Sequence, residues 1–202
     1  KAISLGIGMV HQHFMLARSL TVVENVMLGR KSRKGILLDT RETAEELVAL
    51  AERYRMKVDP YAKVSTLTVG QQQRVEIIKA LYKKCDLLVL DEPTAMLDPN
   101  GRREVLRTVE ELRRQEKVTV ILITHYMEEV IDADKVFVMD HGHVVMEGTP
   151  REIFSQVDTL KSYRLDVPQV TILADELQKR GIPVPAGILR KEELVEALCR
   201  LK

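Results

Sequence analysis

Hydrophobic residues in this chain occur partly in short unbroken runs and partly at helical spacing, a pattern that predicts strands alternating with helices. The unbroken runs have the length of strands, and such runs are typical of parallel sheets buried on both faces. They cover residues 7–10, 87–90, 118–123, 136–139 and 144–146. The last two runs flank Asp140-His141-Gly142-His143, which favours a hairpin turn. We therefore expect an α/β core.

Helices are expected between these runs, where apolar residues recur every three or four positions. One begins near Asp39 or Thr40, either of which can cap it. Another begins at Pro99, with Asp98 as its cap. A third runs from Gly70 to Lys84. Its inward face would carry Val75, Ile78 and Tyr82, and the rest of its surface Arg74, Glu76, Lys79 and Lys83.

The chain changes character after residue 156. Residues 1–156 carry the strands and are expected to form the main domain, whereas 157–202 are expected to form a small helical tail. Two apolar stripes predict the helices of this tail, and Pro183 and Pro185 lie in a stiff linker between them. The stripes consist of Val170, Leu173, Ala174 and Leu177, and of Leu194, Val195, Leu198 and Leu201.

Composition excludes several classes of protein. The 202 residues carry a net charge of +1, which gives no electrostatic case for nucleic acid, and the basic run from Arg30 to Gly35 is expected to be a solvated loop. No apolar run approaches the roughly 20 residues that span a bilayer. Cys85 and Cys199 lack metal-ligand spacing, which favours two inert thiols in a reducing cytosol. His11 and His13 could share a strand face as metal ligands, but loop histidines are the favoured interpretation.

The run from Leu87 to Leu90 is followed at once by two carboxylates, Asp91 and Glu92, and then by Pro93. Open α/β sheets bind ligands at the carboxyl ends of their strands. One carboxylate can hold a hydrated Mg²⁺ and the next can orient a water molecule, as nucleotide hydrolysis requires. The phosphate-cradling motif G-x-x-x-x-G-K-[ST] does not occur in the 202 residues.

Three other motifs accompany this strand in a fixed order. Gln12 follows the first strand, Leu67 to Arg74 read L-T-V-G-Q-Q-Q-R, and His125 follows the next apolar strand. Each motif alone is weak, but the combination at these spacings is specific. The combination resembles the ATP-binding cassette (ABC) family of transporter ATPases over nearly the whole chain. In this resemblance Gln12 matches the Q-loop, Thr68-Val69-Gly70-Gln71 the signature, Asp91-Glu92 the Walker B strand, Ala95-Met96-Leu97-Asp98 the D-loop, and His125 the switch histidine.

The resemblance implies a partial P-loop NTPase core with a helical subdomain at about 17–84, and with ATP and Mg²⁺ as ligands. Glu92 would act as general base or orient the water, His125 would hydrogen-bond the γ-phosphate, and Asp91 would bind Mg²⁺. Gln12 would sense the metal or the water while its loop faces a membrane subunit. The signature residues Thr68, Val69, Gly70 and Gln71, together with Asp98, would contact nucleotide held by a second ATPase subunit.

Two departures from the family pattern affect this interpretation. Thr68 and Val69 replace the Ser and the first Gly of the usual signature; Thr keeps the hydroxyl group, whereas the β-branched Val69 disfavours a positive φ. The phosphate loop, with its lysine and its Mg²⁺-binding hydroxyl, is the larger departure. In the family that loop precedes the Q-loop, so we expect the missing part to lie N-terminal to Lys1.

The two halves of the chain resemble different subfamilies. The front half, from Gly8 to Leu16 and from Val69 to Glu76, is similar to ATPases of simple-sugar and nucleoside importers. The back half, with Ala95 to Arg102 and the tail from Leu173 to Pro185, is similar to energy-coupling-factor ATPases. A recombinant or chimeric gene is one hypothesis for this change. Both resemblances imply import, at the cytoplasmic face of the membrane and beneath integral membrane subunits.

Three functions remain open at this point. The first is the ATP-hydrolysing subunit of an ABC importer, working as a homodimer or heterodimer. The second is a catalytically incompetent module that offers its signature motif to a complete partner or only binds other subunits. A DNA-repair ATPase of the same superfamily is disfavoured, because no long coiled-coil insertion separates Gln12 from Gly70.

Overall fold

The computed structural model describes residues 2, 5–28, 40–116 and 118–201, and it divides the chain into two compact units, Lys1–Ile123 and Thr124–Lys202. Each unit has its own hydrophobic core. The basic run Arg30 to Gly35 and the expected helix cap Asp39 lie outside the described residues. None of the helices in the described part of the chain has the length and apolarity needed to cross a bilayer.

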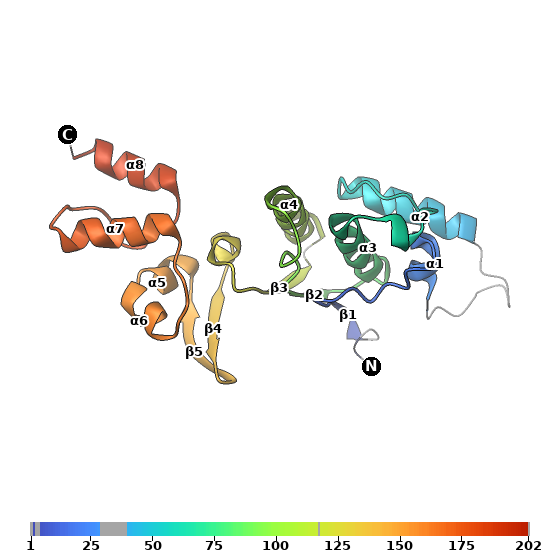
Figure 1. Cartoon of the computed structure of the whole chain (residues 1–202), viewed down its shortest axis with the longest axis horizontal. Coiled ribbons are helices and arrows are strands. Elements are labelled where there is room, and N and C mark those ends of the chain that lie inside the picture. The colour runs from blue at the N-terminus through green and yellow to red at the C-terminus, as the bar shows by residue number, and fades with distance from the viewer. Residues whose placement is uncertain (1, 3–4, 29–39, 117, 202) are drawn as a thin grey trace. The chain divides into compact units, whose positions relative to one another are not determined.

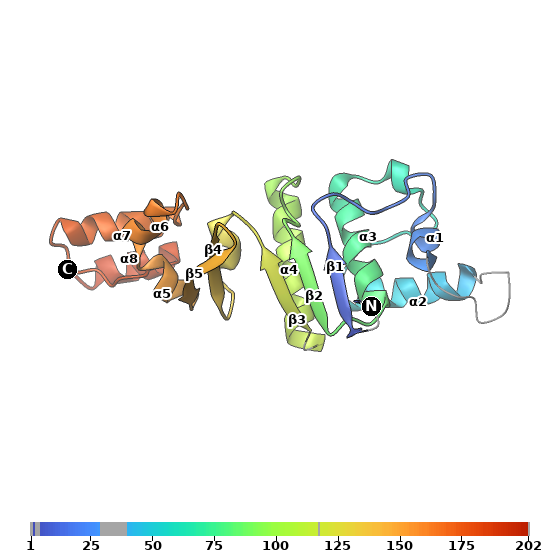
Figure 2. The same ribbon diagram turned by 90° about the horizontal axis from the view of Figure 1, so that it is seen from below.

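The first unit contains a parallel sheet of three strands, as the apolar runs predict. The strands are β1 (Ile7–Val10), β2 (Leu87–Asp91) and β3 (Thr119–Ile123), in the order β1-β2-β3. Val10 pairs with Leu90, and Asp91 pairs with Ile123. Figure 2 shows the three strands side by side, with their carboxyl ends at the same edge.

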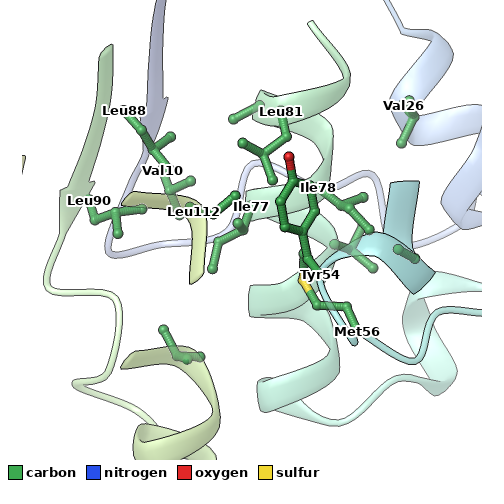
Figure 3. Close-up of a cluster of buried hydrophobic side chains, with 14 of the residues drawn as sticks. Val10, Val26, Tyr54, Met56, Ile77, Ile78, Leu81, Leu88, Leu90 and Leu112 are labelled. Carbon is green, nitrogen blue, oxygen red and sulfur yellow. The ribbon is translucent and has the colours of Figure 1, made fainter. Parts of the chain in front are cut away.

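Helices cover one face of this sheet. Both α3 (Val69–Tyr82) and α4 (Pro99–Glu116) lie on the same side of it (Figures 1 and 2). Val10, Leu88 and Leu90 are fully buried on that side and, with residues of both helices, form the core drawn in Figure 3. Complete burial of an aliphatic side chain of this size contributes about 2 kcal/mol.

The opposite face of the sheet is only partly covered. Met9, Ile121 and Ile123 are 44%, 46% and 47% exposed, respectively, and burial alternates along β2 and β3. The prediction of strands buried on both faces is therefore wrong for this unit as the structure describes it. The physical reason is that α3 and α4 pack on one side, and an unbroken apolar run does not reveal whether a second layer is present.

Three helices of the first unit pack together beside β1. They are α1 (Val22–Met27), α2 (Thr40–Arg53) and α3, and they share the core of the sheet. A short 3₁₀ turn, η2 (Val64–Thr66), precedes α3. Figure 3 shows Tyr54 and Met56, from the segment after α2, beside Ile78 of α3. This packing fixes α3 against the edge of the sheet where β1 lies.

The second unit begins with a 3₁₀ turn, η3 (Met127–Val130), and the expected hairpin of β4 (Val136–Asp140) and β5 (His143–Gly148). His141 and Gly142 form the turn with φ values of 46° and 81°, the positive pair that a type I′ hairpin turn requires. Two short helices follow, α5 (Pro150–Phe154) and α6 (Val157–Ser162).

One hydrophobic core joins the hairpin to these helices and to the chain beyond them. It contains Val138, Ile153, Phe154, Val157, Leu160, Val167 and Leu189. This core includes residues on both sides of the expected domain boundary at 156/157. The compact units divide the chain at an earlier point, after Ile123. The limits of the family domain and of its helical subdomain remain predictions.

The tail contains the two predicted helices, α7 (Gln169–Lys179) and α8 (Lys191–Cys199). Ala174 and Leu194 are buried between them together with Val184 and Ile188 of the linker. The predicted stripes are only partly correct, because four of their members are exposed. These are Leu173, Val195, Leu198 and Leu201, with exposures between 37% and 60%. Two helices that pack mainly on each other and on their linker bury only one narrow face each.

Candidate functional site

The carboxyl edge of the sheet brings Gln12 and Glu92 together. Each lies two residues beyond a member of the register pair Val10–Leu90, so the parallel strands deliver both residues to the same edge. Gln12 Nε2 donates a hydrogen bond to Glu92 Oε2 over 2.9 Å. Two positions that the sequence marks as separate motifs are therefore in direct contact.

Glu92 lies at a sharp turn of the backbone that ends β2. Its φ is +44°, in the left-handed region that costs a residue other than glycine about 1–2 kcal/mol. Its N–H still donates to the carbonyl oxygen of Ile123 on the neighbouring strand over 2.9 Å, which holds the turn against β3. Strained backbone of this kind persists where the surroundings fix it, and it is common at functional sites.

Asp91 ends β2 and is half-buried. Because side chains alternate along a strand, Asp91 lies on the face opposite Leu90, the face that α3 and α4 leave uncovered. The described residues include no cluster of three or more His, Cys, Asp or Glu side chains that could hold a metal ion. The single carboxylate of Asp91 still fits Mg²⁺, which proteins usually bind through one or two carboxylates together with substrate phosphates.

The signature residues form the N-terminus of α3. Thr68 is the N-cap: its side chain accepts from the N–H of Gln71, and the Gln71 side chain accepts from the N–H of Thr68 over 2.8 Å. This reciprocal pair is a capping box, a T-x-x-Q signal that the sequence contains and that our sequence analysis missed. The box fixes where α3 begins and leaves Val69 39% exposed beside the cap.

Val69 does not disturb the backbone here. The helix begins at Val69, one residue earlier than predicted, and neither Val69 nor Gly70 has a positive φ. The positive φ that Val69 would disfavour is therefore not used here, because the first turn of a helix has an ordinary negative φ.

Gly70 has no evident role inside this chain. A Cβ atom at position 70 would meet only Leu97 Cδ2, at 3.8 Å, an ordinary van der Waals contact. Neither backbone conformation nor packing within the unit therefore requires glycine. The same distance shows that the start of α3 lies beside the segment that leads to Asp98.

Asp98 caps α4, as predicted. Its Oδ1 accepts from the N–H of Gly101 over 2.7 Å, and Pro99 is the first residue of the helix. His125 belongs to the second unit, two residues after Ile123, and its ring lies 4.2 Å from that of Tyr126. The side-chain contact between Gln12 and Glu92 is thus the one that directly joins two of the predicted catalytic residues within a single unit.

Comparison with known proteins establishes the family. The profile of the ABC transporter family matches residues 1–95, and that of the energy-coupling factor transporter EcfA1 C-terminal domain matches residues 171–202. The energy-coupling factor transporter ATP-binding protein EcfA1 of Clostridium novyi is 45% identical over 196 residues, which are 96% of this chain and 69% of that protein. The chain belongs to the ATP-binding cassette family of transporter ATPases.

Other relatives of this cassette chain agree with that assignment. EcfA1 of Caldanaerobacter subterraneus subsp. tengcongensis is 58% identical over 134 residues, 66% of this chain and 48% of that protein. The nucleoside import ATP-binding protein NupA of Lactococcus lactis subsp. cremoris is 46% identical over 143 residues, 70% of this chain and 28% of that protein. The chain thus spans only about half the length of some curated relatives that it matches. The two names correspond to the two subfamilies that the sequence resembles.

Solved structures show the same fold. CbiO1 from Clostridium perfringens, described as part of the ABC transporter complex cbiONQ, matches with a TM-score of 0.64 and 29% identity over 84% of this chain and 67% of that one. A dimeric post-hydrolysis state of the ATP-binding cassette MJ0796, bound to ADP and Pi, matches with a TM-score of 0.58 and 26% identity, covering 71% of this chain and 62% of that one. The predicted α/β cassette fold is confirmed.

The cassette also contains site-related residues that the sequence analysis assigned to the surface or overlooked. Glu76 was expected on the polar surface of α3 but is only 3% exposed, and its Oε1 accepts from the N–H of Met15, three residues after Gln12. Asn25 of α1 is 1% exposed and binds the backbone of Ala17. Helical periodicity places Glu76 next to inward-facing residues. It cannot show that the backbone N–H of Met15, in a distant loop, donates a hydrogen bond to it.

Proposed function

We propose that this chain is the ATP-binding and ATP-hydrolysing subunit of an ABC-type importer. The observation that carries the proposal is the contact between Gln12 and Glu92 at the carboxyl edge of the sheet, with Asp91 next to it. An amide and a carboxylate in contact at this edge can orient one water molecule, which is the main requirement of nucleotide hydrolysis beyond charge neutralisation.

In this proposal the site residues divide the work of hydrolysis. Glu92 accepts the proton of the attacking water or orients it, and Gln12 holds the Glu92 carboxylate and senses the metal or the water. His125 hydrogen-bonds the γ-phosphate. Asp91, with Gln12 nearby, holds Mg²⁺, which neutralises developing charge on the phosphate oxygens when it is bound.

The start of α3 would serve a second ATPase subunit. Thr68, Val69, Gly70 and Gln71 present backbone N–H groups at a helix N-terminus, where the helix dipole favours an anion. Because nothing among the described residues requires glycine at position 70, its lack of a side chain suits the close approach of a phosphate group held by the partner. Asp98, beside this helix start, would contact the same nucleotide.

The names of the relatives support a proposal about partners and location. Their names describe energy-coupling factor and nucleoside import ATP-binding proteins and a subunit of a cbiONQ complex. We infer that this chain pairs with a second ATPase subunit beneath integral membrane subunits, peripherally at the cytoplasmic face of the membrane. A net charge of +1 gives no reason to add nucleic acid as a partner.

A second candidate function uses only the start of α3, where Thr68, Val69, Gly70 and Gln71 form a helix N-terminus. The chain could then act as a module that offers Thr68 to Gln71 to a complete cassette without hydrolysing ATP at its own carboxylates. Both candidates predict use of the signature, but only the first predicts turnover that depends on Glu92.

One experiment separates the two. The chain is extended at its N-terminus by the phosphate-loop segment of an EcfA-type cassette. Mg²⁺ and ATP are titrated against it, alone and with a complete EcfA-type cassette, while complex formation and phosphate release are measured. Under the main proposal both Glu92→Gln and Gly70→Arg abolish the turnover that the chain adds. In a signature-offering module only Gly70→Arg does so. ATP-independent association, with no turnover added by the unmodified chain, would contradict both.

A further inference from the structure

Side chains of two helices bind the backbone of the loop after Gln12 at every second residue, Met15 and Ala17. The N–H of Met15 donates to Glu76 Oε1 over 2.7 Å, and the carbonyl oxygen of Met15 lies 3.5 Å from Lys79 Nζ. Both backbone groups of this residue therefore bind one turn of α3. An extended segment normally satisfies such groups by pairing with another strand.

Two residues further along, Asn25 performs the same task from α1. Its Oδ1 accepts from the N–H of Ala17 over 2.7 Å, and its Nδ2 donates to the carbonyl oxygen of Ala17 over 3.0 Å. The spacing of two residues is that of a strand, so side chains of two helices replace a neighbouring strand along this segment. The loop from Gln12 to Ala17 is thereby fixed without belonging to the sheet.

Glu76 and Lys79 form a largely buried ion pair on α3, and burying its charges costs free energy unless they are well paired. Glu76 is 3% exposed, and its Oε2 lies 2.7 Å from Lys79 Nζ one turn away on the same helix. A buried carboxylate needs both a counter-charge and hydrogen-bond donors to offset its desolvation. Lys79 supplies the charge and the Met15 amide supplies a second donor, so the carboxylate and the loop stabilise each other.

We propose that Glu76 and Lys79 are positioning residues that link the signature helix to Gln12. The pair lies on α3, whose N-terminus carries Thr68 to Gln71, and it holds Met15, three residues from Gln12. Any displacement of α3 caused by nucleotide at the signature would move the loop and change the contact between Gln12 and Glu92. This inference rests on the proposed function for its consequence, but the link itself exists without nucleotide.

The test uses the full 202-residue chain without nucleotide. In the double variant Glu76→Leu/Lys79→Met apolar side chains replace the pair, a change that leaves no unpaired charge and that many buried ion pairs tolerate. Glu76→Gln keeps an acceptor for the Met15 N–H. Glu110→Gln on α4, which removes the carboxylate that binds Arg113 and Arg114, is the matched control.

Amide hydrogen exchange at Met15 and the NMR signal of the Gln12 side-chain amide are measured for each variant. In the double variant we expect Met15 to exchange at least about tenfold faster and the Gln12 signal to shift, while exchange elsewhere along α3 stays unchanged. Glu76→Gln should stay within about threefold of the unmodified chain, because its amide oxygen still accepts. Glu110→Gln should change neither reading.

Three results would overturn the inference: unchanged exchange at Met15, an unchanged Gln12 signal, or faster exchange spread evenly along α3 with a lower denaturation midpoint. The last result would reduce the pair to a structural role. Because no nucleotide is present, these outcomes do not depend on whether the chain binds or hydrolyses ATP. Failure of the proposed function would therefore be recognised separately.

Discussion

Gln12 and Glu92 lie 80 positions apart in the chain, yet their side chains are joined by a hydrogen bond of 2.9 Å. The parallel register of β1 and β2 produces this contact, because both residues follow the pair Val10–Leu90 by the same two steps. The backbone turn at Glu92 also contributes, because the N–H of Glu92 donates a hydrogen bond to Ile123 of β3 and holds the turn in place. The contact therefore depends on all three strands.

Gln12→Ala should separate catalysis from stability. The lost hydrogen bond is solvent-exposed, so we expect the free energy of unfolding to change by less than about 0.5 kcal/mol. The ATPase rate of the pair formed with a complete cassette should fall at least about tenfold, because Glu92 loses the group that orients it. His13→Ala, an exposed change in the same loop, should leave that rate unchanged, and equal losses in both variants would refute a specific role for Gln12.

The positive φ of Glu92 can be measured as strain. Glu92→Ala and Glu92→Gly both remove the carboxylate, but only glycine adopts φ near +44° at little cost. The glycine variant should be more stable than the alanine variant by about 1 kcal/mol in urea unfolding, and both should lack turnover. Equal stability of the two would show that the surrounding structure relaxes around residue 92.

Gly70→Ala should leave the fold intact and weaken use of the signature. A methyl group at position 70 meets only Leu97 at an ordinary distance, and alanine favours helix over glycine, so stability should stay equal or rise by up to about 1 kcal/mol. Under the proposed function, ATP-dependent association with a complete cassette should nevertheless weaken at least about tenfold, because the methyl group would lie where the partner's phosphate approaches. Thermal unfolding and ATP-dependent sedimentation would test the two parts, and undiminished association would exclude close contact at Gly70.

The two cysteines should differ in reactivity. Burial raises the pKa of the Cys85 thiol above its usual 9.0, whereas Cys199 is exposed. At pH 8 an alkylating reagent should therefore modify Cys199 quickly and Cys85 only after unfolding, as mass spectrometry of the digested chain would show. Rapid modification of both thiols in the folded chain would contradict the burial of Cys85.

The same pKa shift has a consequence for stability. Well below pH 9.0 the thiol is protonated in both folded and unfolded chains, so its contribution is fully present. As the pH rises from there towards the higher folded pKa, the unfolded chain ionises first and stability falls. Cys85→Ser should remove this alkaline dependence, whereas Cys199→Ser should retain it.

Local rules allowed much of the fold to be predicted. Unbroken apolar runs located β1, β2 and β3, and Asp98-Pro99 identified the start of α4. The turn at Asp140 to His143 followed from its residue types. In the candidate site, the motifs named Gln12 and Glu92, although only the register of the strands shows that they touch.

The failures concern interactions between distant segments. Glu76 reads as a surface residue because a helical pattern does not show that a loop amide and Lys79 surround it. The apolar stripes of the tail include Leu173 and Val195, which are exposed. A stripe in the sequence does not show how much of it a packing partner covers. The roles of all the site residues remain predictions, and those of His125 and the start of α3 also depend on contacts beyond one compact unit.

The half-covered sheet has a practical consequence for work with this chain. Its uncovered side carries Met9, Ile121 and Ile123, and within the described residues β3 pairs along one edge only. Apolar surface beside unpaired strand groups promotes association between copies. Purification at low concentration with a mild detergent, or an Ile121→Lys variant, should therefore keep the chain monodisperse, and a hydrophobic dye would report how well each measure works.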